Sequence, residues 1–474
     1  MVIFAAVLVS GCDNGDDILF PNGIGGGDDD SFECVASISD VSVRTHPDNA
    51  LAFYASWTTP EPASSRVEFG RADDGLDFVI EDDNKVTDHE VFVFGMKPET
   101  EYMFAAVSIM DSGEEAYCSE ELGFTSGTVP FAGADAEVTV YDRELAYHGW
   151  TLGNFLMADN QQSAWMVIWD MDGDPVWYYD YGLTEGRSDQ EVTLVYDGDK
   201  PRILIGGGVK KNEPATELDL EWNVTWEGPV QSDGMGTEGD MHHCMHRTST
   251  NNYVALFHAW EDSSTHTEVR EFDRELNVLW SWMLYQHTDW DGYDMGNHVI
   301  VDYEDDAVYY NEQLSKGFYK IDRSTGEVIW KLGEDGDFEV INSKSDEDFG
   351  YFTHAPELLP DDRLLIFHNG SDQSGSAAIE WQLDFGAMTA TAIWSWNGGE
   401  DDGWYNYCWG DVDRLPNGNT LVTAGTPDPP NREPRLMEVA PDEELVWELR
   451  IYDTDPDFKG SYMSERIPVL VGEK

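Results

Sequence analysis

The stretch Asp322-Arg323-Ser324-Thr325-Gly326-Glu327-Val328-Ile329-Trp330 combines an acidic residue, a turn and an apolar strand that ends in tryptophan. The same plan recurs in five other segments of the chain. The tryptophans that end the six copies are Trp177, Trp226, Trp280, Trp330, Trp394 and Trp447. A unit that repeats at a regular interval is typical of propellers and solenoids. This repeat decides the fold class, which we expect to be all-β.

The spacing of the repeat matches one propeller blade. Successive tryptophans lie from 49 (226 − 177) to 64 (394 − 330) residues apart, close to the length of a four-stranded sheet with its loops. Six copies therefore predict a six-bladed β-propeller over residues 130–474. A stack of open hairpins is the alternative, but a closed ring leaves fewer exposed strand edges, which favours closure.

Residues 34–127 predict a separate N-terminal β-sandwich. Short alternating strands separated by turn residues are typical of that architecture. The expected strands are Leu51–Trp57, Ser65–Gly70, Glu90–Phe94 and Tyr102–Val107. The region resembles a fibronectin type III domain, with a core Trp57, a turn at 97–102 and a closing strand at 124–127. Nothing in it gathers histidines, cysteines or carboxylates, so we expect no catalysis there.

The cysteines indicate an oxidising compartment. Cys34 and Cys118 bracket the sandwich and are expected to form a disulfide. Cys244 and Cys408 are left open, either as a second pair or as two thiols.

The N-terminus predicts a lipid anchor. Residues 1–12 are a short apolar run ending in Val9-Ser10-Gly11-Cys12, which resembles the lipobox of bacterial lipoproteins although the basic residues of a signal peptide are missing. Residues 13–33 are acidic and glycine-rich, as expected for a flexible tether. No later apolar stretch approaches the roughly 18 residues that span a bilayer. We therefore expect an extracytoplasmic protein, periplasmic or at the cell surface, attached to a bacterial membrane through lipidated Cys12 only.

The charge of the chain excludes one class of partner. Lys and Arg total 27 against 94 Asp and Glu, for a formal charge of −67, so nucleic acid would be repelled. The acidic turns at 170–174 and 289–294 resemble calcium loops, but neither has the distal glutamate at loop position twelve. We expect ordinary hairpin turns there, and no metal.

A second repeat places polar residues around one opening. The segment His354 to Phe367 matches the segment from Gly410 to Leu421, and the same register puts His243 and Asn297 at equivalent positions. Innermost strands surround the central channel of a propeller, so these positions are expected to converge there.

At this point the sequence resembles the bacterial arylsulfate sulfotransferases over roughly residues 130–460. The segments that carry the resemblance are 241–243, 322–333, 354–370 and 404–418. The resemblance implies a six-bladed propeller that moves a sulfuryl group from a phenolic sulfate to another phenol without a nucleotide donor or other cofactor. It also implies that His354 accepts the sulfuryl group covalently and that His243 assists.

The residue types fit that chemistry. Neutral imidazole is a nucleophile near pH 7, because its unperturbed pKa is about 6.5. A departing phenolate, whose conjugate acid has a pKa of roughly 10, needs a proton or hydrogen bonds. His243 and Asn297 are the expected donors. His242 and His246 share the histidine-bearing segment without an assigned role.

The chain departs from the family pattern at two positions. Met295 stands where the family has a histidine, and Gln313 stands where it has an arginine. Loss of a group that stabilises developing charge costs on the order of a hundred- to a thousandfold in rate. We expect His298 and Gln313 to contact substrate, and His298 or Lys316 to compensate.

Two other readings remain open at this stage. Gly296-Asn297-His298 resembles part of a metallophosphatase motif, but Val299 follows where an acid is required. A non-catalytic, lipid-anchored propeller for binding or assembly would keep the scaffold without the activity, and fold alone does not choose.

Overall fold

The computed structural model describes most of the chain after the N-terminal segment. The described residues are 32–131, 134–156, 164–181, 192–198, 200–206, 214–230, 239–261, 264–290, 292–342, 349, 352–371, 375–398, 404–425, 433–453 and 460–473. Cys12, the expected signal segment and all but residues 32 and 33 of the expected tether lie outside them. The described residues are almost entirely strands, with one short helix, α1 (Leu284–His287). None of their helices is long and apolar enough to cross a membrane.

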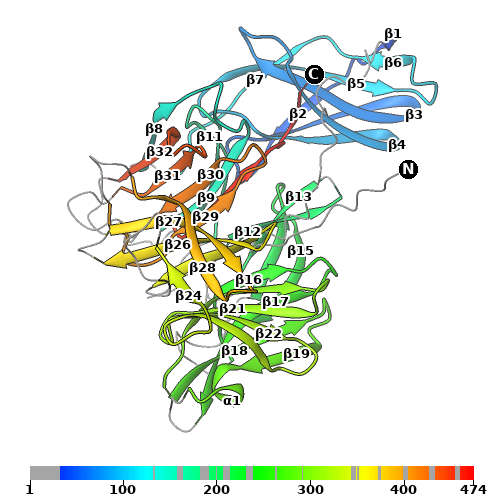
Figure 1. Cartoon of the computed structure of the whole chain (residues 1–474). Helices are drawn as coiled ribbons and strands as arrows, with labels where there is room; N and C mark the ends of the chain where they lie inside the picture. The colour runs from blue at the N-terminus through cyan, green and yellow to red at the C-terminus, as the bar shows by residue number, and fades with distance from the viewer. Residues whose placement is uncertain are drawn as a thin grey trace, which may run out of the picture.

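Six sheets of sequential antiparallel strands form a six-bladed propeller, as predicted (Figure 1). Blade 1 contains β9 (Trp150–Leu156), β10 (Ala164–Trp169) and β11 (Pro175–Asp180), and blade 2 contains β12 (Val192–Asp197), β13 (Lys200–Ile205), β14 (Pro214–Asp219) and β15 (Val224–Val230). Blade 3 contains β16 (Met241–Arg247), β17 (Tyr253–Glu261), β18 (Ser264–Phe272) and β19 (Val278–Met283). Blade 4 contains β20 (Gly296–Asp302), β21 (Ala307–Glu312), β22 (Gly317–Asp322) and β23 (Val328–Gly333).

The last two blades follow the same plan with one extra strand each. Blade 5 contains β25 (Thr353–Leu359), β26 (Arg363–Ser371), β27 (Gly375–Asp384) and β28 (Thr389–Trp396), and β24 (Glu339–Ile341) adds to its outer edge. Blade 6 contains β29 (Asp411–Arg414), β30 (Thr420–Ala424), β31 (Arg435–Val439) and β32 (Leu445–Asp453).

Strands from both ends of the propeller sequence close the ring. The late strand β33 (Ser464–Ile467) pairs with β9 and completes blade 1 on its inner side. The early strand β8 (Ala134–Tyr141) pairs with β32 on the outer edge of blade 6. Opening the ring would therefore break hydrogen bonds in two sheets, and the predicted closure is confirmed.

The repeated tryptophans tie each blade to the next. Each lies in the outermost of the four sequential strands of its blade, and four of them donate their indole N–H to a backbone carbonyl in a turn of the following blade. These bonds run from Trp177 to Leu220, Trp226 to Arg274, Trp280 to Arg323 and Trp447 to Met171, at 2.7 to 3.0 Å. The repeat is conspicuous in the sequence because it forms the joint between blades.

The N-terminal strands form the expected β-sandwich. They are β1 (Glu33–Ser37), β2 (Ser42–Thr45), β3 (Phe53–Arg71), β4 (Phe78–Val93), β5 (Glu101–Ile109), β6 (Glu115–Cys118) and β7 (Leu122–Thr125). Trp57 is buried in the core, as expected, and its indole N–H donates to Ser108 Oγ at 2.8 Å. The first two expected strands are one long strand, β3, whose pairing with β4 shifts at bulges between Thr58 and Ser65.

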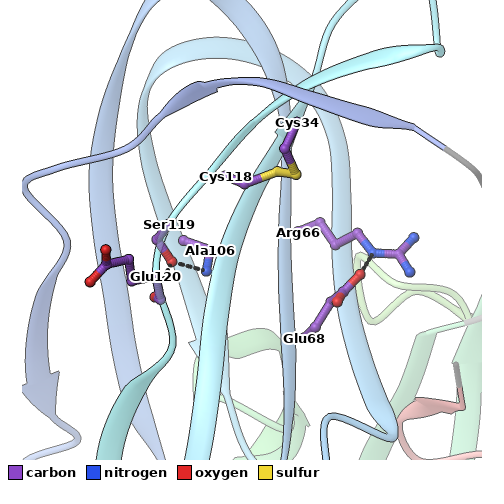
Figure 2. Close-up of a disulfide and its surroundings, with 7 residues drawn as sticks. All are labelled: Cys34, Arg66, Glu68, Ala106, Cys118, Ser119 and Glu120. Atoms are coloured by element: carbon purple, nitrogen blue, oxygen red, sulfur yellow. Dashed lines mark hydrogen bonds and ion pairs between the residues drawn. A yellow bond between two sulfur atoms is a disulfide. The ribbon is translucent and has the colours of Figure 1, made fainter.

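The disulfide between Cys34 and Cys118 is confirmed (Figure 2). It links β1 to β6, which also pair in parallel. Cys244 and Cys408 do not form a disulfide with each other, and Cys244 lies buried in a core between blades 3 and 4.

The sandwich is docked on blade 1 through a charged contact. The Lys97 ammonium enters the acidic turn of that blade and lies 2.6 Å from an oxygen of Asp170 and 2.7 Å from one of Asp174. The backbone N–H of Ala50 also donates to the Tyr178 hydroxyl at 2.8 Å. The cation held by this turn is thus an ammonium of the protein itself, consistent with the hairpin turn expected at 170–174.

The end of the chain returns to the sandwich. Figure 1 shows the C-terminal segment rising from the propeller to the first domain, where β34 (Gly472–Glu473) pairs with β4. Val471 is buried in the core of that domain. The expected propeller range of 130–474 includes this segment, which the structure adds to the sheet of the N-terminal domain.

Candidate functional site

The candidate site lies where the inner strands of blades 3, 4 and 5 begin. These strands, β16, β20 and β25, lie side by side, with β20 in contact with both of the others. His243, Asn297 and His354 fall within the first three residues of their strands. Adjacent blades therefore present these residues at one end of the same inner wall.

His354 is held in one tautomer by an amide. Its Nδ1 lies 2.6 Å from Asn369 Oδ1. The Asn369 Nδ2 donates to the carbonyls of Asn406 and Trp409, at 2.8 and 2.7 Å, which fixes the amide so that Oδ1 must accept. The Nδ1 of His354 consequently carries the proton, and Nε2 carries the lone pair.

Burial keeps His354 neutral. The side chain is 3% exposed, and desolvation lowers its pKa from 6.5 to about 4, against the opposing effect of the Asn369 hydrogen bond. Charge repulsion from His243 lowers this pKa further. At neutral pH His354 is an uncharged imidazole whose Nε2 carries a lone pair, the form in which a histidine can act as a nucleophile.

His243 occupies a strained, half-buried position. Its φ is +54°, in the left-handed region that few residues other than glycine adopt. Its Nδ1 lies 2.8 Å from Nδ1 of His242, whose ring stacks on His258 with centroids 4.1 Å apart. Burial is the main cause that lowers the pKa of His242 well below 6.5, followed by repulsion from His258 and His243. A strained backbone of this kind is common at functional sites.

Asn297 is anchored beside His354 and keeps one donor. Its Nδ2 donates to the carbonyl of Thr353 at 2.6 Å, and its Oδ1 accepts from Asn311 Nδ2 at 2.7 Å. An amide nitrogen has two N–H groups, so the second is available to a ligand.

His298 follows Asn297 on strand β20. It is buried, and its pKa is lowered well below 6.5, by desolvation first and then by repulsion from His246 and His354. Asn297 thus contacts Thr353, the residue before His354, and charges on His243 and His298 would repel a charge on His354.

The two positions that depart from the family lie at the rim. The backbone N–H of Gln313 donates to the carbonyl of Met295 at 3.2 Å. Lys316 forms an ion pair with Glu334 at 2.8 Å, and its side chain is about a third exposed. Beneath them the buried carboxylate of Glu312 accepts from the backbone N–H of Met295 at 2.7 Å, and burial raises its pKa.

The sheet register corrects the alignment of the blades. The repeated tryptophan marks equivalent positions in the second strands of blades 3 to 6. The positions that then pair with equivalent residues are His242, His298, His354 and Asp411. The expected equivalence of His243, Asn297 and Gly410 with His354 is therefore wrong by one residue.

The physical reason is a difference in β-bulges. Strand β16 has two extra residues between His242 and Met245, and β25 has one between His354 and Glu357. Bulges re-aim side chains and are common beside active sites. His243 lies inside its bulge, which explains its positive φ.

Sequence reasoning missed two features of the site. Asn369, which orients His354, was noted only as part of the resemblance. The second feature is a buried pair of His266 and Asp294, with Nδ1 2.7 Å from Oδ2. Asp294 also accepts from the backbone N–H of Thr267, whose hydroxyl oxygen lies 3.4 Å from His242 Nε2. No local sequence signal marks either pairing, because the partners come from different strands. Among the described residues no group of histidines, cysteines and carboxylates is arranged to hold a metal ion.

Comparison with known proteins agrees with the resemblance. Residues 296–455 match the family model described as Arylsulfotransferase (ASST), a range that includes Asn297, Gln313 and His354 but not His243. No curated protein matches the chain.

Two solved structures are distantly similar to the chain. One is a dihydro-heme d1 dehydrogenase, NirN, in complex with DHE, with a TM-score of 0.33, 8% identity, and coverage of 70% of this chain and 77% of that chain. Another is an ACO/RPE65 chimera, with a TM-score of 0.33, 10% identity, and coverage of 67% and 93%.

The family match is thus the comparison that bears on chemistry, and it supports a sulfuryl-transferring enzyme.

Proposed function

We propose that this chain transfers a sulfuryl group from an aryl sulfate to a phenolic acceptor, with Nε2 of His354 as the nucleophile and no nucleotide donor. The observation that carries the proposal is the hydrogen bond from His354 Nδ1 to Asn369 Oδ1, which leaves the Nε2 lone pair unprotonated. The family match over residues 296–455 supplies the reaction class.

In the first step, Nε2 of His354 attacks the sulfur of the aryl sulfate. The S–N bond forms as the bond between sulfur and the aryl oxygen breaks, and the aryloxide takes a proton from the imidazolium form of His243, which becomes neutral. The ring of His354 gains positive charge in this step. Asn369 Oδ1 stabilises that charge, because it accepts the Nδ1–H that becomes more acidic.

In the second step, the acceptor phenol gives its proton to His243 while its oxygen attacks the sulfur. The S–N bond breaks, and the electron pair returns to Nε2 of His354. The remaining N–H of Asn297 is available to donate to a sulfuryl oxygen or the departing oxygen in both steps. His298 and Gln313 are proposed to line the space that holds the aryl groups.

The decisive experiment follows 4-nitrophenol release from 4-nitrophenyl sulfate with and without a phenolic acceptor. We expect acceptor-dependent release, and His354→Ala should lower it by on the order of a thousandfold or more. His148→Ala, which changes an exposed histidine elsewhere on the propeller, serves as the control and should keep the rate of the unsubstituted protein.

Two results would contradict the proposal. Release that survives in His354→Ala would remove His354 as the nucleophile. Absence of release with every aryl sulfate tried would favour the non-catalytic binding propeller, a role consistent with Met295, Gln313 and the ion-paired Lys316.

We also propose that Cys12 carries a lipid that holds the protein at a bacterial membrane, in the periplasm or at the cell surface. The support is the segment Val9-Ser10-Gly11-Cys12 and the following acidic, glycine-rich residues. Cys12→Ser should move the protein from the membrane fraction to the soluble fraction. Equal membrane association of both forms would overturn the anchor.

A further inference from the structure

A polar pocket of about 470 Å³ lies between blades 2 and 3, away from the histidines. Its walls come from the hairpin of β12 and β13, the end of β16 and the turn before β19. Arg247 lies in this pocket four positions after His243 on β16, and a strand rises about 3.3 Å per residue. The pocket therefore lies toward the opposite end of the inner strand from the candidate active site.

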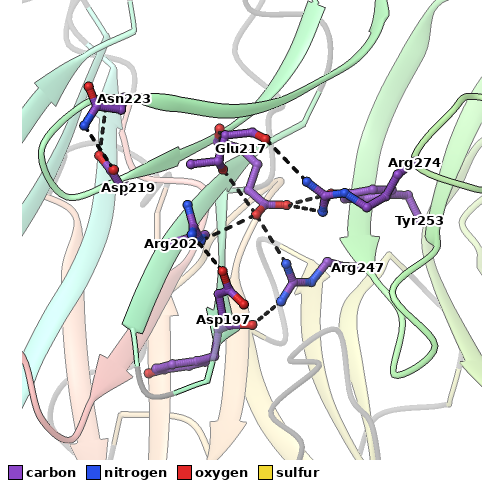
Figure 3. A network of polar contacts seen from close by, with 10 residues as sticks. Asp197, Arg202, Glu217, Asp219, Asn223, Arg247, Tyr253 and Arg274 are labelled. Carbon is purple, nitrogen blue, oxygen red and sulfur yellow. Dashed lines mark hydrogen bonds and ion pairs between the residues drawn. The ribbon is translucent and has the colours of Figure 1, made fainter. Parts of the chain in front are cut away.

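Three arginines in the pocket converge on one buried glutamate. Figure 3 shows Arg202, Arg247 and Arg274 pointing at the carboxylate of Glu217 from different sides. The nitrogen to oxygen distances are 3.9, 3.2 and 3.3 Å respectively, and the Glu217 side chain is 2% exposed. Asp197 contributes one further carboxylate, 2.8 Å from Arg202.

The other blade junctions show what this arrangement adds. In blades 2, 3, 5 and 6 the residue paired with the tryptophan is a glutamate, and each of these glutamates binds an arginine of the next blade. Glu271 has Arg323 as its arginine, and Arg323 is also shared with Asp306. Glu438 has Arg466. Glu380 has Arg414 of the next blade and Arg363 of its own blade. One arginine from the next blade is therefore enough to join two blades.

The junction at Glu217 carries a surplus of positive charge. Among the described residues it has three guanidinium groups against the carboxylates of Glu217 and Asp197, whereas the junction at Glu271 has one guanidinium against two carboxylates. This local excess stands out in a chain of net charge −67. It also includes a pocket rather than a filled interface.

The arginines keep hydrogen-bonding capacity. Their other protein partners are the carbonyls of Tyr196 and Thr225 and the hydroxyl of Tyr253. These contacts use fewer than half of the roughly 15 N–H groups on three guanidiniums. Their exposed side-chain fractions are 18% for Arg202 and 34% for Arg274, so both can be reached from the pocket.

We propose that this pocket binds a tetrahedral oxyanion, either free or as the sulfate or phosphate group of a small molecule. Planar guanidiniums match such oxygens with paired, charge-assisted hydrogen bonds, which makes several arginines a suitable set of donors. The volume fits a small ligand rather than a macromolecule. This site does not depend on catalysis at His354 and holds whether or not the transfer reaction occurs.

The test is calorimetric titration of the whole protein with sodium sulfate, with sodium chloride adjusted to keep sodium concentration and ionic strength constant. We expect saturable binding. Arg202→Gln and Arg274→Gln should each weaken it about tenfold or more, because each removes charge-assisted hydrogen bonds. Inorganic phosphate and methyl sulfate, titrated in parallel, distinguish a site for the free ion from one that accepts an esterified group.

Arg323→Gln is the matched control. Arg323 holds the same position in blade 4 that Arg274 holds in blade 3, since the backbone carbonyl of each accepts the indole N–H of the preceding blade. It should lower stability and leave sulfate affinity unchanged. Equal weakening by all three substitutions, or no saturable binding by any of the three anions, would overturn the proposal. So would sulfate binding that is lost in His354→Ala and kept in the two pocket variants.

Discussion

The two ends of strand β16 carry different kinds of side chain, neutral imidazoles at its start and charged groups at its end. At its start, His243 and its neighbours form a cluster of imidazoles and amides in which burial lowers histidine pKa values. At its end, Arg247 belongs to a cluster of full charges around Glu217. An imidazole must be neutral to offer a lone pair as a nucleophile, whereas an oxyanion is bound by positively charged hydrogen-bond donors. The length of β16 therefore separates the candidate active site from the proposed anion-binding pocket.

The largest effect expected at the neutral end follows loss of the amide that orients His354. Asn369→Leu removes the acceptor 2.6 Å from Nδ1, so the proton is free to move to Nε2, and kcat/KM should fall by roughly a hundred- to ten-thousandfold. Asn369→Asp keeps an acceptor and adds a negative charge, which raises the pKa of His354.

The pH profile distinguishes an orienting role from a structural one. The acid limb of activity in Asn369→Asp should lie at higher pH than in the unsubstituted protein, because His354 becomes protonated earlier. An unshifted acid limb, with activity equal to that of the unsubstituted protein in both variants, would show that Asn369 does not orient His354.

At the charged end, Glu217→Gln should destabilise the fold by about 3 to 5 kcal/mol. The substitution leaves three partly buried guanidiniums without their shared, buried counterion. Chemical unfolding measures the change. Glu271→Gln is the comparison, and it should cost less because it leaves one guanidinium, Arg323, with Asp306 still beside it. A larger loss of unfolding free energy for Glu271→Gln would show that the additional arginines at Glu217 do not increase the cost of removing its charge.

Acid should destabilise the protein through its buried histidines. Burial lowers the pKa of His354 to about 4 and that of His246 to about 3, from 6.5. A histidine with a depressed folded pKa contributes stability above its unfolded pKa and loses it as pH falls toward the folded value. Each should lower the free energy of unfolding by up to about 1.4 kcal/mol per pH unit below about 6.5.

Unfolding titrations between pH 7 and pH 4 test this dependence. His246→Asn should flatten it, while Arg202→Gln, at the charged end, should leave its slope unchanged. An identical slope in both variants and the unsubstituted protein would contradict the assignment.

The smallest expected effect concerns the tryptophan hydrogen bonds between neighbouring blades. Trp447 and Trp394 are equivalent, and each is buried with an arginine over its ring. Within the described parts of the chain, the Trp447 indole N–H donates to the carbonyl of Met171, whereas the Trp394 indole N–H has no acceptor. Trp447→Phe should therefore cost about 1 kcal/mol more than Trp394→Phe. Equal losses in chemical unfolding would show that the bond does not strengthen the joint.

From the sequence, the candidate site residues could be selected, but their equivalence between blades could not be aligned correctly. His354 could be found because it begins a strand that repeats visibly in the next blade. The equivalence with His243 failed by one position, because β16 and β25 contain different numbers of bulged residues and a bulge leaves no reliable mark in the sequence. Asn369, His266 and Asp294 were missed since their partners lie on other strands.

The sequence by itself determined the blade count, the sandwich and the disulfide between Cys34 and Cys118. These follow from local patterns, namely a tryptophan at a regular interval, alternating strands and two bracketing cysteines. Only the tertiary structure decided the closure by β8 and β33, the docking of Lys97 into the acidic turn and the three arginines around Glu217. Each of these contacts joins residues far apart in the chain. The energy of such a contact depends on the distance between the groups and on their burial, which cannot be read from the sequence alone.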